Sequence, residues 1–415
     1  MKATLLGFAA LCAIAVSAAP TVSNVTVSQD KSTRVVTVRY DLSEKAIVTV
    51  EIFKDGVPLV GGTPLAGDVS KPVSAGTGRW AQWRPRGMDD LPAGKLTARV
   101  RAWTESNPPD YMAIDLVGAE QRYYASTNEL PYPVVSDYYR TVGMLFRRIP
   151  AKGVTFKMGS PSGEVGRQSN ETLHEVTLTN DFYMAVFEVT QGQWINGITK
   201  EWYGNPDQGK GIYGTHMPSL SIESGYPDSW LRPVDNLSYK ETMGNQQGMA
   251  PTKLYADAVG RCASTWIYNF AKSVKVSNVT LPTEAQWEFA CRAGEDGATY
   301  APDEATGDLA WYEGNADEAQ PVGLKKPNAW GLYDMLGNVW ENCLDHYQAD
   351  LGADPVTAPY LQGTDNYKTC RGGAYDSSSD SVRSARRTAL TKQSDWTMAG
   401  NQIPNLGFRI IIGIH

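Results

Sequence analysis

One stretch of the chain, residues 328–347 (NAWGLYDMLGNVWENCLDHY), restricts the local fold more than any other. Gly331 and the adjacent pair Gly337 and Asn338 are residue types that tolerate positive φ angles, so they predict tight turns. Large aromatic residues stand between these turns. The stretch is too interrupted for an ordinary helix or strand, and it predicts an irregular loop packed with aromatic side chains.

The same stretch carries acidic side chains at Asp334, Glu341 and Asp345. Carboxylates along an irregular glycine loop, with backbone carbonyls nearby, are ligands that suit a hard cation such as Ca²⁺. The spacing differs from that of an EF-hand loop. From spacing alone, a glycine turn whose acids face water is the simpler interpretation.

Length and charge limit the classes of protein to consider. A chain of 415 residues with 42% hydrophobic and 20% charged residues is long enough for two folded domains. Its net charge is −7 and it contains no basic run, which argues against nucleic acid or an anionic membrane surface as a partner.

The N-terminus has the pattern of a secretory signal peptide. A basic start at Lys2 precedes an apolar run from Ala3 to Val16, and small residues follow up to Ala18. We therefore expect residues 1–18 to be a cleaved signal peptide and the mature protein to be secreted or periplasmic. The remaining chain has no apolar stretch of transmembrane length, so we expect no membrane insertion.

The four cysteines beyond this leader do not follow the spacing of a zinc site. Export makes disulfides the default expectation, and four cysteines allow three pairings. We favour the pairings Cys262 with Cys291 and Cys343 with Cys370, although spacing alone leaves all three open.

Residues 19–118 are predicted to form a small β-sandwich of immunoglobulin or fibronectin type III kind. Alternating or β-branched segments predict its strands, at Thr33–Leu42, Ala46–Phe53, Leu96–Trp103 and Tyr111–Val117. Residues 119–141 contain Pro131 and Pro133 as breakers and are predicted to be a linker.

Residues 142–415 are predicted to form a loop-rich α+β domain. Short strands are expected at Val154–Met158 and Glu175–Thr179, separated by long polar loops. One helix is expected from Thr252 towards Ala271. Two further helices are expected where Thr283 and Thr190 begin the capping pattern Thr-x-x-Gln.

Five pieces of this second domain resemble the formylglycine-generating enzyme (sulfatase-modifying factor) superfamily. In order they are Phe156–Ser160 (FKMGS), Phe187–Thr190 (FEVT), Leu281–Glu288 (LPTEAQWE), Pro327–Glu341, and the pair Arg371–Gly373 (RGG) with Leu406–Arg409 (LGFR). The resemblance spans about residues 142–414 and implies a variant of the C-type lectin-like fold.

The resemblance also implies what chemistry to expect. Its founding enzymes oxidise a sulfatase cysteine to formylglycine with O₂, using copper held by two cysteine thiolates. Here Ser377 stands at the first of those positions, and no cysteine follows Cys370. A serine hydroxyl is not a soft ligand for Cu(I), so copper and a catalytic residue at Ser377 are not expected. A second branch uses iron held by histidines, and the four histidines of this chain do not indicate such a site.

The calcium loop of the family does carry over by position. The resemblance implies one Ca²⁺ held by the side chains of Asp334 and Glu341 and the backbone carbonyls of Gly337 and Val339. It also implies a binding groove beside the loop, for which we select Trp340, Tyr375, Ser377, Ser378, Arg383 and Arg386. A solvated loop with internal ion pairs is the alternative interpretation of this charged segment.

We therefore expect an exported, non-catalytic module that binds a peptide, a glycan or a protein. The alternative is an oxidoreductase of the same superfamily, which acts on a sulfur substrate with O₂ through a non-standard metal site. A purely structural surface protein would be indicated if the groove were filled by its own loops.

Overall fold

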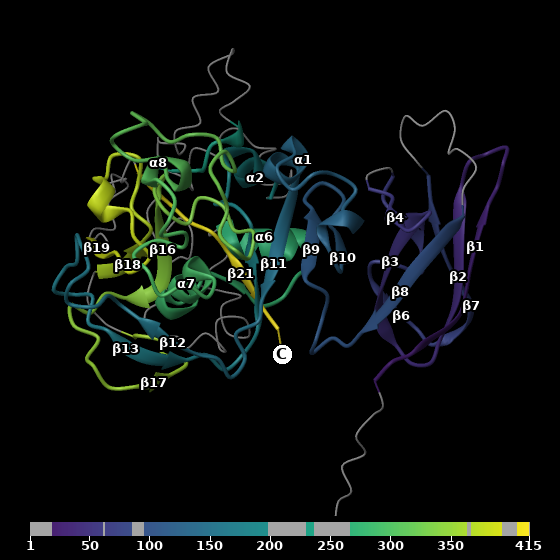
Figure 1. The fold of residues 1–415 in the computed structure, drawn as a ribbon, viewed down its shortest axis with the longest axis horizontal. Helices are drawn as coiled ribbons and strands as arrows, with labels where there is room; N and C mark the ends of the chain where they lie inside the picture. The colour runs from purple at the N-terminus through teal and green to yellow at the C-terminus, as the bar shows by residue number, and fades with distance from the viewer. Residues whose placement is uncertain are drawn as a thin grey trace, which may run out of the picture.

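A computed structural model describes residues 19–60, 63–84, 95–197, 230–235, 266–362, 367–391 and 405–414. The chain is mixed α/β, with many strands and few helices. Figure 1 shows a smaller β part on the right and a larger part on the left, joined between β8 (Leu96–Trp103) and β9 (Tyr111–Asp115). The expected signal peptide, residues 1–18, lies outside the described residues. Within the described ranges no helix is both long enough and apolar enough to cross a membrane.

The smaller part, which we call the N-terminal sandwich, has two antiparallel sheets. One sheet has the order β1-β2-β7-β5, formed by Val22–Gln29, Val36–Leu42, Gly76–Trp83 and Ala66–Gly67. The other has the order β4-β3-β6, with β8 also paired to β3, formed by Val57–Pro58, Ala46–Lys54, Pro72–Val73 and Leu96–Trp103. Alternate residues of β2 and most of β3 are buried in one shared core. The immunoglobulin or fibronectin type III likeness stays a prediction.

The end of this sandwich differs from the expected boundary at residue 118. The expected strand Tyr111–Val117 is present as β9 (Tyr111–Asp115), but β9 pairs with β10 (Glu120–Tyr124) and β11 (Gly143–Ile149). The expected linker 119–141 contains β10, the 3₁₀ helix η1 (Thr127–Glu129) and α1 (Asp137–Thr141). Alternation of apolar residues predicts that a strand exists but does not specify its partner, which explains the difference.

The larger part, from β9 onwards, is the C-terminal domain. Its main sheet has the order β10-β9-β11-β14-β21-β15, in which the last three strands are Phe182–Ala185, Ile411–Gly413 and Val279–Thr280. A second sheet is β12-β13-β17, formed by Thr155–Met158, His174–Thr177 and Val356–Thr357. A third is β19-β18-β16-β20, formed by Arg387–Thr391, Tyr367–Arg371, Trp340–His346 and Leu406–Gly407.

The helices that matter for the site are α2 (Gln191–Asn196), α6 (Trp266–Val274), α7 (Glu284–Arg292) and α8 (Thr306–Leu309). Both expected capping boxes are confirmed. Thr190 and Gln193 close the start of α2, and Thr283 and Gln286 close the start of α7. Of the helix expected from Thr252, residues 252–265 lie outside the described part, and the described remainder is α6.

The expected disulfides are wrong, because Cys291, Cys343 and Cys370 are free thiols. Cys370 is paired across the sheet with Asn342, the residue next to Cys343. Successive side chains of a strand point to opposite faces, so Cys343 and Cys370 face opposite sides of the sheet. They lie in different core clusters. Cys262 lies outside the described residues.

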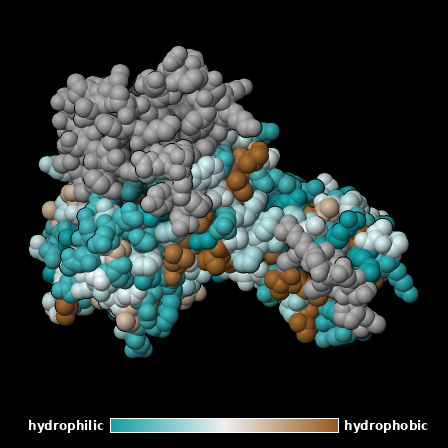
Figure 2. All heavy atoms as spheres, turned by 90° about the horizontal axis from the view of Figure 1, so that it is seen from above, coloured by the Kyte–Doolittle hydropathy of each residue, from teal (hydrophilic) through white to brown (hydrophobic). Residues whose placement is uncertain are grey.

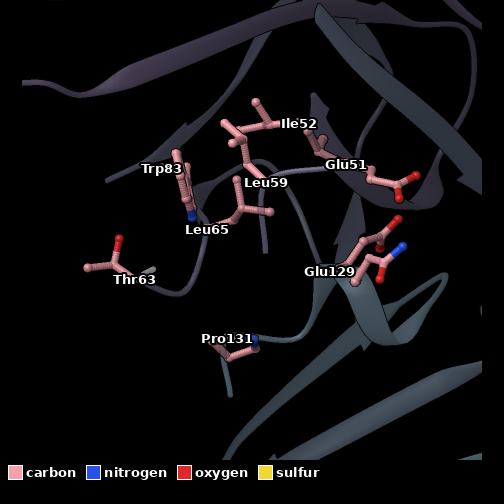
Figure 3. A pocket seen from close by; sticks show the side chains of 10 residues that line it. Glu51, Ile52, Leu59, Thr63, Leu65, Trp83, Glu129 and Pro131 are labelled. Atoms are coloured by element: carbon pink, nitrogen blue, oxygen red, sulfur yellow. The ribbon is translucent and has the colours of Figure 1, made fainter. Parts of the chain in front are cut away.

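The two parts meet along β10 and η1. Tyr123 of β10 donates its backbone N–H to the carbonyl of Ser70 (2.9 Å), and Arg122 donates Nη1 to the carbonyl of Leu65 (2.6 Å). Figure 3 shows a small pocket at this junction, where the carboxylates of Glu51 and Glu129 lie side by side. On the face drawn in Figure 2, hydrophobic residues form small separate groups within a mostly hydrophilic surface.

Candidate functional site

The turn at Gly337 and Asn338 has the predicted positive φ angles, 73° and 59°. A Cβ atom at Gly337 would lie 2.0 Å from the carbonyl oxygen of Trp311, so this position requires glycine for space as well as for φ. Gly337 donates its N–H to the carbonyl oxygen of Gly372, and Asn338 donates its N–H to the carbonyl oxygen of Trp311; each N···O distance is 2.9 Å. The turn is therefore held between two segments that are distant in sequence.

Glu188 anchors the same turn from the other side. Its Oε2 accepts a hydrogen bond from Nδ2 of Asn338 (2.6 Å), and its Oε1 accepts one from the N–H of Val339 (3.2 Å). The carboxyl group is fully buried, and burial is the main reason why the pKa of Glu188 is raised well above its usual value. The sequence identified Phe187–Thr190 as a family motif but not this role of Glu188.

Glu341 faces a guanidinium group inside the domain. Its Oε1 accepts from Nη2 of Arg409 (2.6 Å), and its Oε2 accepts from Nε of Arg409 (2.7 Å) and from the indole N–H of Trp287 (2.7 Å). Glu341, Arg409 and Trp287 are all fully buried. This bidentate pair ties β16 to α7 and to the last strands of the chain.

Asp334 is also buried but is only half satisfied. Its Oδ2 accepts from the N–H of Gly323 (2.7 Å), whereas Oδ1 has no hydrogen-bond partner among the described residues. Burial raises the pKa of Asp334 to about 6. The carboxyl groups of Glu188, Asp334 and Glu341 thus all lie in the electrostatic field of the Arg409 guanidinium.

These contacts test the expected calcium ligands. Asp334 offers an unsatisfied oxygen on the expected loop, which fits a cation ligand. Both oxygens of Glu341 already bind Arg409, so Glu341 fits less well. Within the described ranges no three His, Cys, Asp or Glu side chains converge as a metal-binding group. Calcium at this loop stays a prediction.

The residues present do not fit the copper of the founding enzymes. Ser377 accepts a hydrogen bond on Oγ from the N–H of Ala374 (2.9 Å), so its hydroxyl closes a local turn. Cys343 and Cys370 face opposite sides of a sheet and are fully buried, and burial raises the pKa of both thiols. Buried, separated and protonated thiols do not supply a thiolate pair for Cu(I).

The structure brings together part of the expected groove. Trp340 packs in a small buried cluster with Cys370, Ala374 and Leu406. Tyr375 is half-buried and donates its backbone N–H to the carbonyl of Asn338 (2.8 Å), which places it directly beside the glycine turn. Ser377 and Ser378 follow in the same loop, with Ser378 exposed.

Arg383 is held in the interior, whereas the place of Arg386 in the expected groove stays a prediction. Arg383 is buried and forms ion pairs with Glu164 (2.5 Å) and Glu171 (2.8 Å). Arg386 is half-buried, and burial lowers the pKa of its guanidinium. Arg383 thus forms the internal ion pairs of the alternative interpretation, although its side chain is buried rather than solvated.

Acidic groups lie near Tyr375 instead, and one of them, Glu318, is paired with Arg232 (2.8 Å). After burial, the causes that raise the pKa of its hydroxyl are Asp376, Asp235 and Glu318. Asp376 accepts from Nδ2 of Asn405 on both carboxylate oxygens, each at 2.8 Å. The sequence did not indicate Asp235 or Glu318, because they are distant in the chain and carry no motif. We call Trp340, Tyr375, Asp376, Asp235 and Glu318 the Tyr375 surface.

Comparisons with known proteins agree with these features. Residues 146–414 match the family described as "Sulfatase-modifying factor enzyme 1-like domain". A formylglycine-generating enzyme of Streptomyces coelicolor is 36% identical over 148 residues, which are 31% of this chain and 45% of that enzyme. The chain therefore spans less than half the length of that relative.

Two further comparisons cover more of the length of the protein compared. An inactive C-alpha-formylglycine-generating enzyme 2 of Bos taurus is 24% identical and matches 65% of this chain and 89% of its own length. The solved structure of PvdO from Pseudomonas aeruginosa has a TM-score of 0.50 and 21% identity, over 65% of this chain and 94% of PvdO. The likeness to PvdO concerns the fold alone.

Proposed function

The chain belongs to the sulfatase-modifying factor enzyme 1-like family, and from that premise we propose that its C-terminal domain is a non-catalytic binding module. The observation that carries the proposal is the chemistry at the former copper site. Ser377 uses its hydroxyl in a local turn, and the described thiols Cys291, Cys343 and Cys370 are buried in protein cores. Among the described residues, none at this position supplies the soft thiolates that the family's oxidation requires.

The Tyr375 surface supports a binding role. An aromatic side chain that is half-buried beside a rigid turn can contact a ligand at a low entropic cost. Three carboxylates, those of Asp376, Asp235 and Glu318, lie near Tyr375, and of these Glu318 is paired with Arg232 (2.8 Å), so the negative charge of the described residues still exceeds the positive charge there. A peptide or protein segment that carries Lys or Arg is therefore favoured over an anionic glycan.

A relative of the same family supports the loss of catalysis. The Bos taurus protein that aligns over 89% of its length is described as an inactive C-alpha-formylglycine-generating enzyme 2. A non-catalytic member of this family therefore has a parallel. Export of the mature chain after removal of residues 1–18 is part of the same proposal, and mass spectrometry of the protein from its host would test the cleavage.

The proposal can be tested with a peptide library that varies net charge at constant length. We expect basic peptides to bind the purified chain, and Tyr375→Ala to weaken them about tenfold. Tyr367→Ala is the matched control, since Tyr367 is an exposed tyrosine on β18 outside the Tyr375 surface. Equal binding of acidic and basic peptides, or equal effects of the two variants, would contradict the proposal.

The alternative, an oxidoreductase with a non-standard metal site, makes a different prediction. Cu(I) supplied under reducing conditions would bind stoichiometrically and would be lost in Cys343→Ser or Cys370→Ser. A cysteine peptide incubated with that copper-loaded protein and O₂ would become lighter by the mass difference between cysteine and formylglycine. We expect neither copper retention nor a mass change.

A further inference from the structure

A cavity of about 120 Å³ lies where the N-terminal sandwich meets the C-terminal domain. Pro64 borders it from the sandwich, and residues of β9, β10 and the segment 131–139 border it from the C-terminal domain. The volume is close to that of engineered cavities of about 150 Å³ that bind benzene. The cavity is separate from the Tyr375 surface, since the two have no residue in common.

Tyrosine rings form one wall of this cavity. Tyr132 and Tyr138 are stacked, with ring centroids 4.4 Å apart, and Tyr139 meets both rings edge-on at 6.1 and 5.2 Å. Tyr124 of β10 also lines the cavity. Rings that pack on one another in this way hold each other in place, and a wall of tyrosine rings offers π-electron density that attracts cations.

The charged groups at the cavity sum to a net negative charge. Arg122 is neutralised by Glu120 (2.7 Å) and also donates to the carbonyl of Leu65 (2.6 Å). Asp115 accepts hydrogen bonds from the hydroxyl of Tyr138 (2.9 Å) and from the backbone N–H groups of Val117 and Gly118, but none of these donors carries a charge. The lining therefore favours a cation over an anion.

One polar group at the cavity is left without a partner. Tyr139 is fully buried, and its hydroxyl has no hydrogen-bond partner among the described residues. Buried hydroxyl groups are normally satisfied by protein or by water, so the unpartnered Tyr139 oxygen is available to accept from a bound group. An ammonium group could donate one N–H to the Tyr139 oxygen while its positive charge faces the tyrosine rings.

We propose that this cavity binds an alkylammonium group, such as a primary amine or the end of a lysine side chain, between the tyrosine wall and Asp115. The aromatic faces and Asp115 hold the charge, and the Tyr139 oxygen accepts one N–H. Because Pro64 belongs to the other part of the molecule, the occupant also touches both sides of the junction. Figure 3 shows the smaller neighbouring pocket at the same junction, which shares Pro131 with this cavity.

The test uses n-butylammonium as the probe, with n-butanol and butyrate as neutral and anionic partners of similar shape. Binding to the full mature chain is measured by saturation-transfer NMR and by calorimetry. We expect n-butylammonium to bind and the other two probes to bind at least about tenfold more weakly. Binding of n-butanol as tight as that of the amine would overturn the proposal, and so would preferential binding of butyrate.

Variants locate the site. Tyr139→Phe removes only the unpartnered hydroxyl, and we expect about fivefold to tenfold weaker binding, the effect of one hydrogen bond. Asp115→Asn removes the charge, and we expect at least a similar loss. Tyr123→Phe is the matched control, because Tyr123 neighbours Tyr124 on β10 but lies outside the cavity, where its hydroxyl accepts from Gln121. Unchanged amine binding in both Tyr139→Phe and Asp115→Asn, with native thermal unfolding, would overturn the proposal.

Discussion

Arg409 and Glu341 form a bidentate ion pair at 2.6 and 2.7 Å in the interior of the C-terminal domain, with both side chains completely excluded from solvent. The residues are 68 positions apart, and Trp287 donates a third hydrogen bond to the same carboxylate. The pair joins the glycine turn of the family motif to the C-terminal strands. The family resemblance implied that Glu341 is a calcium ligand, but here both of its carboxylate oxygens accept hydrogen bonds from Arg409.

The first prediction concerns this pair. Arg409→Met leaves the carboxylate of Glu341 buried without its counter-charge, so we expect a loss of about 3–5 kcal/mol in the free energy of unfolding. Lys45→Met is the control, since the pair of Lys45 with Glu105 is largely exposed and is worth less than about 1 kcal/mol. Urea denaturation measures both, and similar small losses in the two variants would contradict the structural role of Arg409.

The second prediction concerns calcium at the glycine loop. We expect Ca²⁺ to raise the thermal unfolding temperature, because a ligand at a hundredfold excess over its Kd stabilises by about 2.7 kcal/mol. Asp334→Ala removes the unpaired oxygen and should abolish the shift, whereas Asp334→Asn keeps an oxygen ligand and should retain part of it. The exposed Asp308→Ala is the control. A shift that survives in Asp334→Ala would place any calcium elsewhere.

The third prediction concerns Gly337. Gly337→Ala must keep a φ of 73° and place a methyl group 2.0 Å from the carbonyl oxygen of Trp311. Gly352 has a similar φ of 78°, but an added Cβ there has no neighbour within 4 Å. Gly352→Ala should cost about 1–2 kcal/mol for the conformation alone. Gly337→Ala should cost at least about 2 kcal/mol more, and equal losses by chemical denaturation would contradict the close contact.

The fourth prediction concerns pH and the junction between the two parts. Burial, and then the charge of Glu51, raises the pKa of Glu129 to about 7, and Arg101 at 3.7 Å offsets only part of this rise. The folded protein therefore binds this proton more tightly than the unfolded chain, whose pKa is near 4.5. The contribution of Glu129 to the free energy of unfolding is therefore fully present below pH 4.5. It is lost as pH rises through about 7, by about 3 kcal/mol in total.

Glu129→Gln tests that linkage. The variant cannot titrate, so it should match the wild type near pH 4 and exceed its stability by up to about 3 kcal/mol near pH 8. Glu120→Gln is the control, because the Glu120 side chain is 55% exposed. The burial of Asp345, whose pKa is raised to about 7, adds a similar slope to every variant, so only the difference from the wild type is informative. A Glu129→Gln variant less stable than the wild type at pH 8 would contradict the pKa.

The fifth prediction concerns the cysteines. We expect iodoacetamide to leave Cys291, Cys343 and Cys370 unmodified in the native protein and to modify all three after unfolding without a reductant. Peptide mass mapping measures each site. Protection of Cys343 and Cys370 after unfolding that disappears only on reduction would restore the disulfide that the sequence favoured.

Local features were predictable because their causes lie within a few residues. The two Thr-x-x-Gln capping boxes and the positive φ angles of Gly337 and Asn338 follow from side-chain chemistry and backbone freedom at those positions. Three strands of the sandwich, β2, β3 and β8, follow from alternating or β-branched residues in the same way. The family motifs, read in order, also predicted the family to which the chain belongs.

The features that failed depend on partners far along the chain. Alternation predicted β9, but only folding paired it with β10 and β11 rather than with the strands of the sandwich. Export suggested disulfides, but the sheet turns Cys343 and Cys370 to opposite faces. Arg383 lies in a charged segment that was expected to border the binding groove. In the structure it forms ion pairs with Glu164 and Glu171 in the interior.

The sequence by itself determined the turns, the caps and the family of this protein, because each rests on short-range chemistry or on a motif that stays together in the chain. Only the tertiary structure decided which charges are buried, which strands pair and which residues meet at Tyr375 and Tyr139. Burial and long-range pairing are properties of the packed chain, and no local pattern specifies the partner that a side chain meets there.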